Sequence, residues 1–432
     1  MTSKWKLLQL AIISSLILSC SPKEKKEESM EKVSSKTAKE ILGNPEYLAI
    51  SYGGYRQKSR EMQPTVAQLK DDMKILYAMG VRILRTYNVQ PDKPHASNVL
   101  KAISELKKED PGFEMYVMLG AWIDCKNAWT ELPPDHDVES EQNEAEIGRA
   151  AALANQYPDI VKVIAVGNEA MVKWAASYFV QPGVILKWVN HLQQLKTDGK
   201  LPKDLWITSS DDFSSWGGGG PEYHVDDLNK LIGAVDYISM HTYPMHNTHY
   251  NPDFWGIFDD EDTLPKADQM QKAMERSLDF AKAQHARVTE YMQGLGYDKP
   301  VHIGETGWAS IDSDNHHYGR KGSGACDEYK EALYYKMMRE WTNKEGISCF
   351  YFEAFDEPWK DAHNSKGSEN HFGLFKGDGR AKYAVWDLVD QGVFEGLTRD
   401  GNPIVKTFDG DAAKVLEEAL MPPLKKTMVV TE

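Results

Sequence analysis

Eight short hydrophobic runs recur along the chain at intervals that leave room for a helix between most of them. The runs are rich in β-branched residues and largely apolar, so they suit strands that are covered on both faces, as in a parallel sheet. They comprise Tyr47–Tyr55, Val81–Tyr87, Met115–Ile123, Val161–Gly167, Leu205–Ser209, Val235–Tyr243, Val301–Gly304 and Ile347–Phe352.

Helical patterns fill the intervals between these runs. They cover Thr65–Met79, Ala96–Lys107, Glu141–Asn155, Pro182–Leu195, Val225–Leu231, Ala267–Gln284 and Asp327–Asn343. In the first of them, Thr65 and Gln68 form a capping-box pattern, and Leu69 and Met73 lie on one face. Strands that alternate with helices in this way predict an α/β fold, a single (β/α)8 TIM barrel with its active site at the C-terminal ends of the strands.

The N-terminus has the pattern of an export signal. Lys4 and Lys6 precede the apolar run Leu7–Leu18, which is too short for a comfortable membrane span and suits a signal peptide. Cys20 follows directly and resembles the lipidated cysteine of a bacterial lipoprotein, although Leu18 is bulkier than that motif usually has. A plain secretory signal with an incidental cysteine is the alternative. We therefore expect an exported protein, lipid-anchored to the outer membrane and exposed at the cell surface.

These features predict a signal peptide over residues 1–19 and a flexible tether over residues 20–40. The tether is rich in Lys, Glu and Ser and has too few large apolar residues to fold. Residues 41–432 would then form one barrel domain with a C-terminal extension packed on it. The lipid at Cys20 would be the chain's only membrane contact, and we expect a monomer.

The composition narrows the range of partners. A formal net charge of −15 disfavours nucleic acid, because phosphate binding depends on Lys and Arg. Beyond Cys20, the chain has Cys125, Cys326 and Cys349, which show no CxxC spacing and predict neither a zinc site nor a disulfide framework. We expect buried thiols, although one disulfide remains possible in an exported protein.

Two glutamates end apolar runs at equivalent places. Glu169 closes Val166-Gly167-Asn168-Glu169 after the fourth run, and Glu305 closes the seventh within Ile303-Gly304-Glu305-Thr306-Gly307-Trp308. One such glutamate alone is equally well explained by an ion pair, but a matched pair on the active face favours chemistry. Two facing carboxylates suit retaining cleavage of a glycosidic bond, with a separation of about 5 to 5.5 Å. Asn168 could bind a sugar hydroxyl and orient Glu169, and Trp308 could stack on a sugar ring.

At this point the chain resembles glycoside hydrolase family 17. The resemblance rests on Asn168-Glu169, on Ile303–Trp308 and on Tyr351-Phe352-Glu353-Ala354-Phe355-Asp356-Glu357-Pro358-Trp359-Lys360, and it extends over Tyr47–Trp386. It implies a β-1,3-glucanase in which Glu169 is the general acid/base and Glu305 the nucleophile. One departure is Ala309, which stands where the family usually has proline.

The same resemblance implies a set of supporting residues. Glu357, Lys360 and Glu369 match groups that support the catalytic pair, and Lys360 would lie near Glu305 and keep it ionised. Tyr87 and Tyr243 match contacts to the bound sugar. Together with Asn168 and Trp308, these five residues form the expected substrate-binding set.

Three functions are compatible with these residues. The first is a retaining hydrolase of β-1,3-glucan such as laminarin, the second a transglycosylase that uses the same glutamates, and the third a non-catalytic glycan-binding lipoprotein. The presence of both glutamates argues against the third, whereas endo and exo attack are both open. We expect neither a cofactor nor a metal, because this chemistry needs none and the spacing of His241, His246 and His249 matches no familiar metal site.

Overall fold

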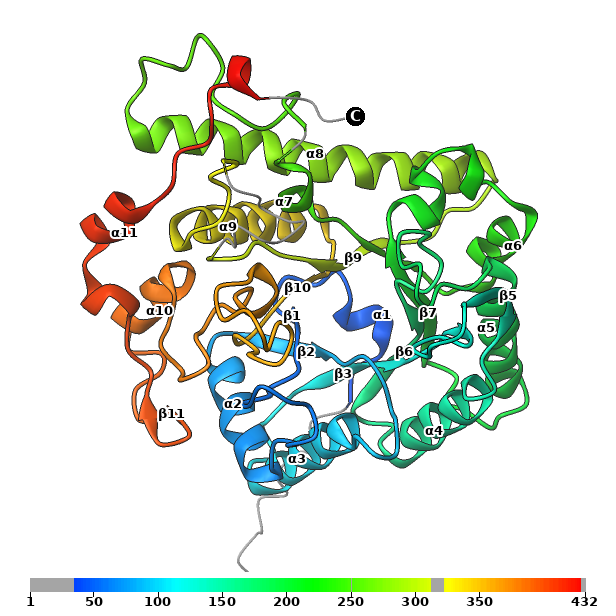
Figure 1. Cartoon of the computed structure of the whole chain (residues 1–432). Coiled ribbons are helices and arrows are strands. Elements are labelled where there is room, and N and C mark those ends of the chain that lie inside the picture. Colours follow the sequence, from blue (N-terminus) through cyan, green and yellow to red (C-terminus); the bar gives the residue numbers. More distant parts are fainter. Residues whose placement is uncertain (1–34, 250, 312–321, 429–432) are drawn as a thin grey trace, which may run out of the picture. The chain divides into compact units, whose positions relative to one another are not determined.

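The computed structural model describes residues 35–249, 251–311 and 322–428. Eight parallel strands close into a barrel in the order β1-β10-β9-β8-β7-β6-β3-β2 (Figure 1). These strands are β1 (Leu48–Ser51), β2 (Val81–Arg85), β3 (Tyr116–Ala121), β6 (Val161–Asn168), β7 (Trp206–Asp212), β8 (Ile238–His241), β9 (Val301–Thr306) and β10 (Cys349–Tyr351). Each predicted run overlaps one of them, so the predicted (β/α)8 fold is confirmed.

Helices surround the barrel, as Figure 1 shows. The first seven barrel strands are each followed by one long helix: α2 (Val66–Ala78), α3 (His95–Glu109), α4 (Asn143–Gln156), α5 (Pro182–Thr197), α6 (Asp226–Ala234), α8 (Lys266–Gly294) and α9 (Glu328–Glu345). After β10 the chain is irregular until the short α10 (Trp386–Asp390). The predicted capping box is present at α2, where Thr65 Oγ1 accepts from the Gln68 N–H at 3.2 Å and Gln68 Oε1 accepts from the Thr65 N–H at 3.0 Å.

The N-terminal end of the barrel is closed by α1 (Ala38–Ile41). Ala38 and Ile41 are fully buried in a cluster with Tyr116 and Phe350, and the Lys36 N–H donates to the Tyr116 hydroxyl at 3.0 Å. The predicted tether was therefore too long, because its last residues are part of the folded domain: two well-placed apolar side chains are enough to anchor them. Residues 1–34, which include the predicted signal peptide, Cys20 and most of the tether, lie outside the described residues.

Two long connections follow barrel strands at the C-terminal end. The one after β3 contains an antiparallel hairpin, β4 (Cys125–Lys126) and β5 (Asp135–Glu139). The one after β8 begins with α7 (Pro244–Asn247). The hairpin was not predicted because most of β5 is half-buried or exposed, so it carries no apolar alternation.

Beyond α10 the chain packs back on the barrel. It contains β11 (Thr398–Arg399), β12 (Asn402–Pro403) and α11 (Ala412–Glu418). Arg399 Nε forms a buried ion pair with Asp72 Oδ1 of α2 at 3.0 Å. Short helical turns lie at η1 (Ser214–Gly218), η2 (Pro221–Tyr223), η3 (Ser368–Asn370), η4 (Tyr383–Val385), η5 (Thr407–Gly410) and η6 (Lys425–Thr427).

The three cysteines of the described part are buried thiols, as expected. Within the described ranges, every helix is too short or too polar to serve as a membrane span.

Candidate active site

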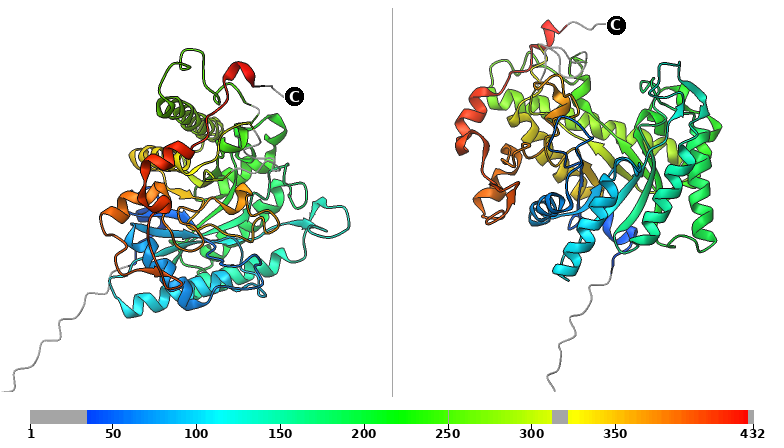
Figure 2. Two further views of the ribbon diagram at one scale, coloured as in Figure 1. Left: turned by 60° about the vertical axis from the view of Figure 1, so that its left-hand side comes forward. Right: turned by 60° about the horizontal axis from the view of Figure 1, so that its bottom comes forward.

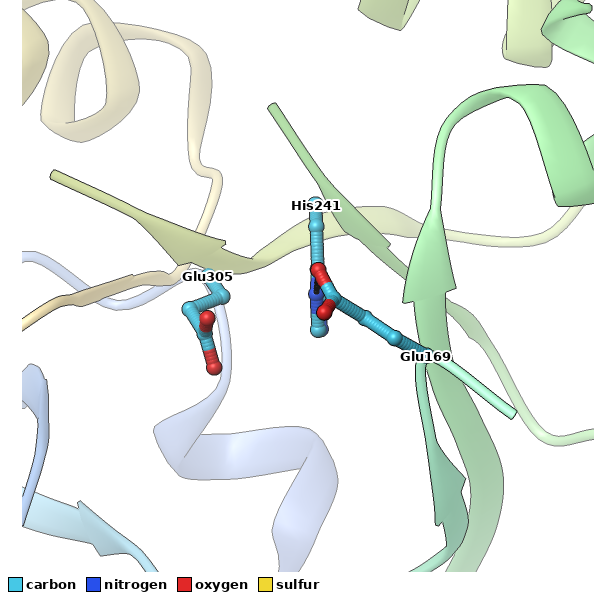
Figure 3. A group of neighbouring side chains, drawn as sticks. All are labelled: Glu169, His241 and Glu305. Atoms are coloured by element: carbon cyan, nitrogen blue, oxygen red, sulfur yellow. Dashed lines mark hydrogen bonds and ion pairs between the residues drawn. The ribbon is translucent and has the colours of Figure 1, made fainter. Parts of the chain in front are cut away.

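Three side chains converge at the C-terminal end of the barrel. Glu169 follows β6, His241 ends β8 and Glu305 lies in β9 (Figure 3). The strand register brings them together, because His241 pairs with Glu305 across β8 and β9. One carboxylate oxygen or ring nitrogen from each of the three lies within 4.8 Å of the corresponding atoms of the other two. Glu169 and Glu305, which are far apart in the sequence, therefore face one another across a single pocket.

The distance between the two carboxylates distinguishes a retaining from an inverting glycosidase. An oxygen of Glu169 lies within 4.8 Å of an oxygen of Glu305. Retaining glycosidases hold their carboxyl groups about 5 to 5.5 Å apart, whereas inverting enzymes leave about 6.5 to 9.5 Å for a water molecule. The distance between Glu169 and Glu305 matches the retaining class. The backbone of Glu169 has a left-handed φ of 48°, a conformation that non-glycine residues adopt mainly where the surroundings impose it.

Glu305 is surrounded by hydrogen-bond donors. The buried Arg85 guanidinium forms an ion pair with Glu305 Oε2 and donates to the Gly304 carbonyl at 2.9 Å. The Tyr243 hydroxyl donates to Oε1 at 2.7 Å and the Tyr87 hydroxyl to Oε2 at 3.1 Å. Burial alone would raise the pKa of Glu305, but the charge of Arg85 and the hydrogen bond from Tyr243 outweigh it and lower the pKa. Glu305 is therefore held as a carboxylate.

For Glu169, the effects that raise the pKa outweigh those that lower it. Its side chain is 16% exposed, and its Oε1 lies 2.9 Å from His241 Nδ1. Burial raises the pKa of Glu169 well above its ordinary value, and the negative charges of Glu305 and Asp212 raise it further. Two identical side chains therefore prefer different protonation states, which is the division that acid/base and nucleophilic roles require.

His241 connects Glu169 to the interior of the barrel. Its Nε2 lies 2.8 Å from the Ser210 hydroxyl, which in turn lies 2.9 Å from the Ser239 hydroxyl. Burial lowers the pKa of His241 to about 4, so the imidazole is neutral near neutral pH. Although Glu169, His241 and Glu305 are close enough to share a metal ion, the Arg85 cation already neutralises Glu305. This ion pair weakens the attraction that Glu305 would offer to a second cation there.

The predicted supporting residues Glu357 and Lys360 lie in the loop after β10 and pair with one another. Lys360 Nζ forms its shortest ion pair, 2.7 Å, with Glu353 Oε2, and a second of 3.4 Å with Glu357. The direct cationic partner of Glu305 is Arg85, which the sequence analysis did not identify, and the expected influence of Lys360 on Glu305 is present as that of a second positive charge. Lys360 lowers the pKa of Glu305 only as a more distant charge. Glu357 accepts from the Tyr55 N–H at 3.0 Å and thereby fixes the loop after β1.

Trp308 does not line the pocket. It is fully buried, its Nε1 donates to the Ala325 carbonyl at 2.8 Å, and its ring packs against Trp255 and Tyr334. The prediction that Trp308 stacks on a sugar was therefore wrong. At Gly307 an added Cβ would lie 2.1 Å from the Phe352 carbonyl oxygen, so the chain passes directly over the neighbouring strand and takes the indole into the core.

The remaining predicted residues surround the glutamate pair. Asn168 Oδ1 accepts from Arg85, and Tyr87 and Tyr243 direct their hydroxyls at Glu305. Tyr243 and Glu369 also line the pocket, where a sugar would contact them. Both tyrosines therefore hold the carboxylate of Glu305, and Tyr243 also faces the pocket.

The pocket is a cleft of about 830 Å³. Its lining includes aromatic residues that the sequence analysis did not single out as site residues, among them Trp174 and Phe213. Trp174 is 58% exposed and lies in the loop after Glu169. Asp211 fixes this loop, because its buried carboxylate accepts the Met171 N–H at 2.7 Å.

Arg85 and His241 were the main residues missed. Arg85 lies near the end of the second apolar run, and Glu169 follows closely after the fourth, so a charged residue at a strand end was the available signal. His241 occupies the equivalent place on β8, but it was considered only as a metal ligand. In both cases the same positional rule that identified the glutamates would have applied.

A (β/α)8 barrel in which a carboxyl group of lowered pKa faces one of raised pKa across a pocket of this size has the arrangement of a retaining glycoside hydrolase. Comparison with known proteins agrees, since residues 49–373 match the family model of the BtgE/BtgC glycoside hydrolase domain. The chain belongs to this family, and its resemblance to glycoside hydrolase family 17 is confirmed.

Individual relatives show how widely the fold is shared. An endo-laminarinase from Formosa Hel1_33_131 is 66% identical, with a TM-score of 0.89 over 92% of this chain and 100% of that one. A glucan 1,3-beta-glucosidase of Arthroderma benhamiae is 25% identical over 73% of this chain and 83% of its own length. The chain spans only 37% of a putative glucan endo-1,3-beta-glucosidase of Aspergillus niger, at 24% identity. A Rhizomucor miehei β-1,3-glucanosyltransferase shares the fold at 18% identity and a TM-score of 0.54 over 78% of this chain and 96% of that one.

Proposed function

We propose that this glycoside hydrolase cleaves β-1,3-glucan of the laminarin type with retention of anomeric configuration. The observation that carries the proposal is the close approach of Glu169 and Glu305 with opposite pKa shifts. The choice of β-1,3-glucan is supported by the 66% identical Formosa protein, an endo-laminarinase. That relative also supports endo attack.

In the first step Glu305 attacks the anomeric carbon, and the bond from this carbon to the departing oxygen breaks. The electron pair of that bond stays on the oxygen, which takes the proton of Glu169. Arg85, Tyr87 and Tyr243 keep Glu305 ionised and hold it in position. The raised pKa of Glu169 keeps a proton available near neutral pH.

In the second step water opens the covalent glycosyl-enzyme. Glu169, now a carboxylate, removes a proton from the water as the water oxygen forms a bond to the anomeric carbon. The bond from that carbon to Glu305 breaks, and its electrons return to the Glu305 carboxylate. Glu305 is then again an anion paired with Arg85, so the charge distribution of the resting enzyme is restored. Neutral His241 is placed 2.9 Å from Glu169 and can hydrogen-bond it in either protonation state.

Transfer to a second sugar instead of water is the alternative outcome of the same intermediate. It needs only an acceptor bound on the Glu169 side of the cleft, where Trp174 offers an exposed ring. Time-resolved chromatography of products from a single laminari-oligosaccharide separates the two, since transfer gives products longer than the substrate.

The decisive experiment is incubation with laminarin, lichenan and mannan, followed by chromatography of the products and NMR of the first anomer released. We expect activity on laminarin with initial β-anomer. Glu305→Ala should abolish it, and Glu169→Ala should abolish it for glucan but spare substrates with good leaving groups. Activity on mannan alone, an inverted first product, or full activity of Glu305→Ala would refute the proposal.

We further propose that the protein is exported and anchored through a lipid on Cys20. The support is the sequence pattern, in which a cysteine directly follows a short apolar run. Metabolic labelling with a fatty acid should mark the wild-type protein but not Cys20→Ser. Release of unlabelled wild-type protein into the medium would indicate a plain secretory signal.

A further inference from the structure

The hairpin β4–β5 presents an exposed tryptophan outside the catalytic cleft. Trp129, between its two strands, is 62% exposed, and its backbone has a left-handed φ of 61°. Asn127 is left-handed too, with φ of 65°. Such a conformation is rare for a bulky residue, so the surroundings hold this indole outward against a local preference. The turquoise hairpin stands out from the barrel in the left view of Figure 2.

Trp129 is supported from one side by other aromatic rings. Its ring stacks on Tyr178 with centroids 5.0 Å apart and an interplanar angle of 22°. Trp122 lies against both, with centroids 6.2 Å from Trp129 and 5.2 Å from Tyr178. Tyr178 is itself buried, so one face of Trp129 rests on a fixed base and the rest of the indole meets solvent. We call Trp122, Trp129 and Tyr178 the Trp129 platform.

The Trp129 platform is continuous with the loops that border the cleft. Trp122 directly follows β3, and Tyr178 lies in the loop after β6 that also carries Glu169 and Trp174. The strands β3 and β6 are neighbours in the barrel. A long ligand that extends out of the cleft on the Glu169 side would therefore pass along the loops that carry the Trp129 platform.

Most charged residues of the hairpin are acidic, and Lys126 is its one Lys or Arg. Trp122 Nε1 donates to Asp124 Oδ2 at 3.2 Å, and Glu131 and Asp135 lie on the same hairpin. Carboxylates disfavour an anionic ligand and suit the hydroxyl groups of a neutral one, while an open indole face suits the C–H face of a pyranose. A neutral sugar chain fits both features.

We propose that the Trp129 platform is a second binding site for the β-glucan, outside the catalytic cleft, in which a glucosyl ring lies on Trp129. This inference rests on the proposed function. Because it adds contacts only for chains long enough to reach the hairpin, it raises the affinity for polymer over that for short oligosaccharides.

The test compares Trp129→Gly and Trp129→Tyr with the control Tyr297→Ala, which removes another partly exposed aromatic ring in the loop that precedes β9, at the opposite end of the barrel. Glycine tolerates the left-handed backbone, so the first variant removes the ring and the local strain together. Melting temperatures of all variants are measured first, to show that each is folded.

We expect Trp129→Gly to raise KM for laminarin about five-fold. The change for a short laminari-oligosaccharide should be several-fold smaller. Trp129→Tyr should recover most of the loss, and Tyr297→Ala should match the wild type. Retarded migration in laminarin-containing gels, measured on a Glu305→Ala background, should weaken in parallel.

An equal effect on polymer and oligosaccharide would overturn the inference by assigning Trp129 to the cleft itself. Unchanged kinetics and unchanged gel retardation would overturn it outright. Either result leaves laminarin hydrolysis intact, whereas a wild-type protein without activity on laminarin would contradict the proposed function instead.

Discussion

Replacement of Arg85 by glutamine tests how the nucleophile is kept ionised. Arg85 is buried at the end of β2, where it pairs with Glu305 and also donates to Asn168 and to the Gly304 carbonyl. Glutamine removes the positive charge and keeps part of the hydrogen-bonding capacity. The hydroxyls of Tyr87 and Tyr243 remain on Glu305.

The size of the effect follows from the loss of one buried charge. Two unit charges about 4 Å apart at an effective dielectric near 20 interact by about 4 kcal/mol, or about three pKa units. The tyrosine hydrogen bonds retain part of this stabilisation, while burial of Glu305 opposes it. Glu305 must be ionised to attack, so activity falls as the pH drops through its pKa. Raising that pKa moves the acidic limb of the pH profile upward, by about one to two pH units.

The assay is kcat/KM on laminarin as a function of pH for Arg85→Gln and for the control Arg399→Gln. Arg399 is also a buried arginine in an ion pair, 3.0 Å from Asp72, but it lies in the C-terminal extension. We expect the control to lose stability and keep its acidic limb. If Arg85→Gln loses activity with an unmoved acidic limb, Arg85 acts by positioning alone and the electrostatic reasoning is refuted.

Three further predictions address separate features. Trp308→Ala should lower the free energy of unfolding by about 3 to 5 kcal/mol in urea titrations, as loss of a core indole does. Trp174→Ala should instead raise KM for laminarin with little loss of stability. The reverse pattern would mean that Trp308 lines the cleft after all. Asp212→Asn should lower the pKa of Glu169 and shift the basic limb of kcat/KM to lower pH, and an upward shift would contradict the assigned cause. Asp72→Asn should cost about 3 to 5 kcal/mol of stability, because it takes the carboxylate partner from the buried Arg399. The pH profile should stay unchanged, and an altered profile would mean that this network reaches the active site.

The strands and the two glutamates were predictable because both are local properties of the sequence. A buried parallel strand must be apolar along its length, and a polar side chain at its C-terminal end must face the active side of a barrel. Glu169 and Glu305 satisfy that rule within a few residues of sequence. Their convergence then required only that the barrel closes, which the repeated alternation of strand and helix indicates.

The partners of these glutamates were not predictable in the same way. Arg85 ends β2, and the barrel order places two strands, β1 and β10, between β2 and β9. The ion pair therefore crosses the interior of the barrel, and no local pattern specifies which of several charged strand ends will meet there. For Trp308 the strand-end rule was misleading, because Gly307 lets the chain pass close over Phe352 and takes the next side chain into the core.

A single asymmetrically placed cation accounts for the different roles of two identical residues. Both glutamates are buried enough for desolvation to raise their pKa, and each repels the other. Arg85 breaks this symmetry, because its guanidinium pairs with Glu305, whereas Glu169 faces neutral His241. Once Glu305 is fixed as the anion, its charge helps to keep the proton on Glu169. The stabilised nucleophile thus maintains its own acid catalyst, and an exchange of roles between the two glutamates would require the cation to move to the opposite side of the barrel.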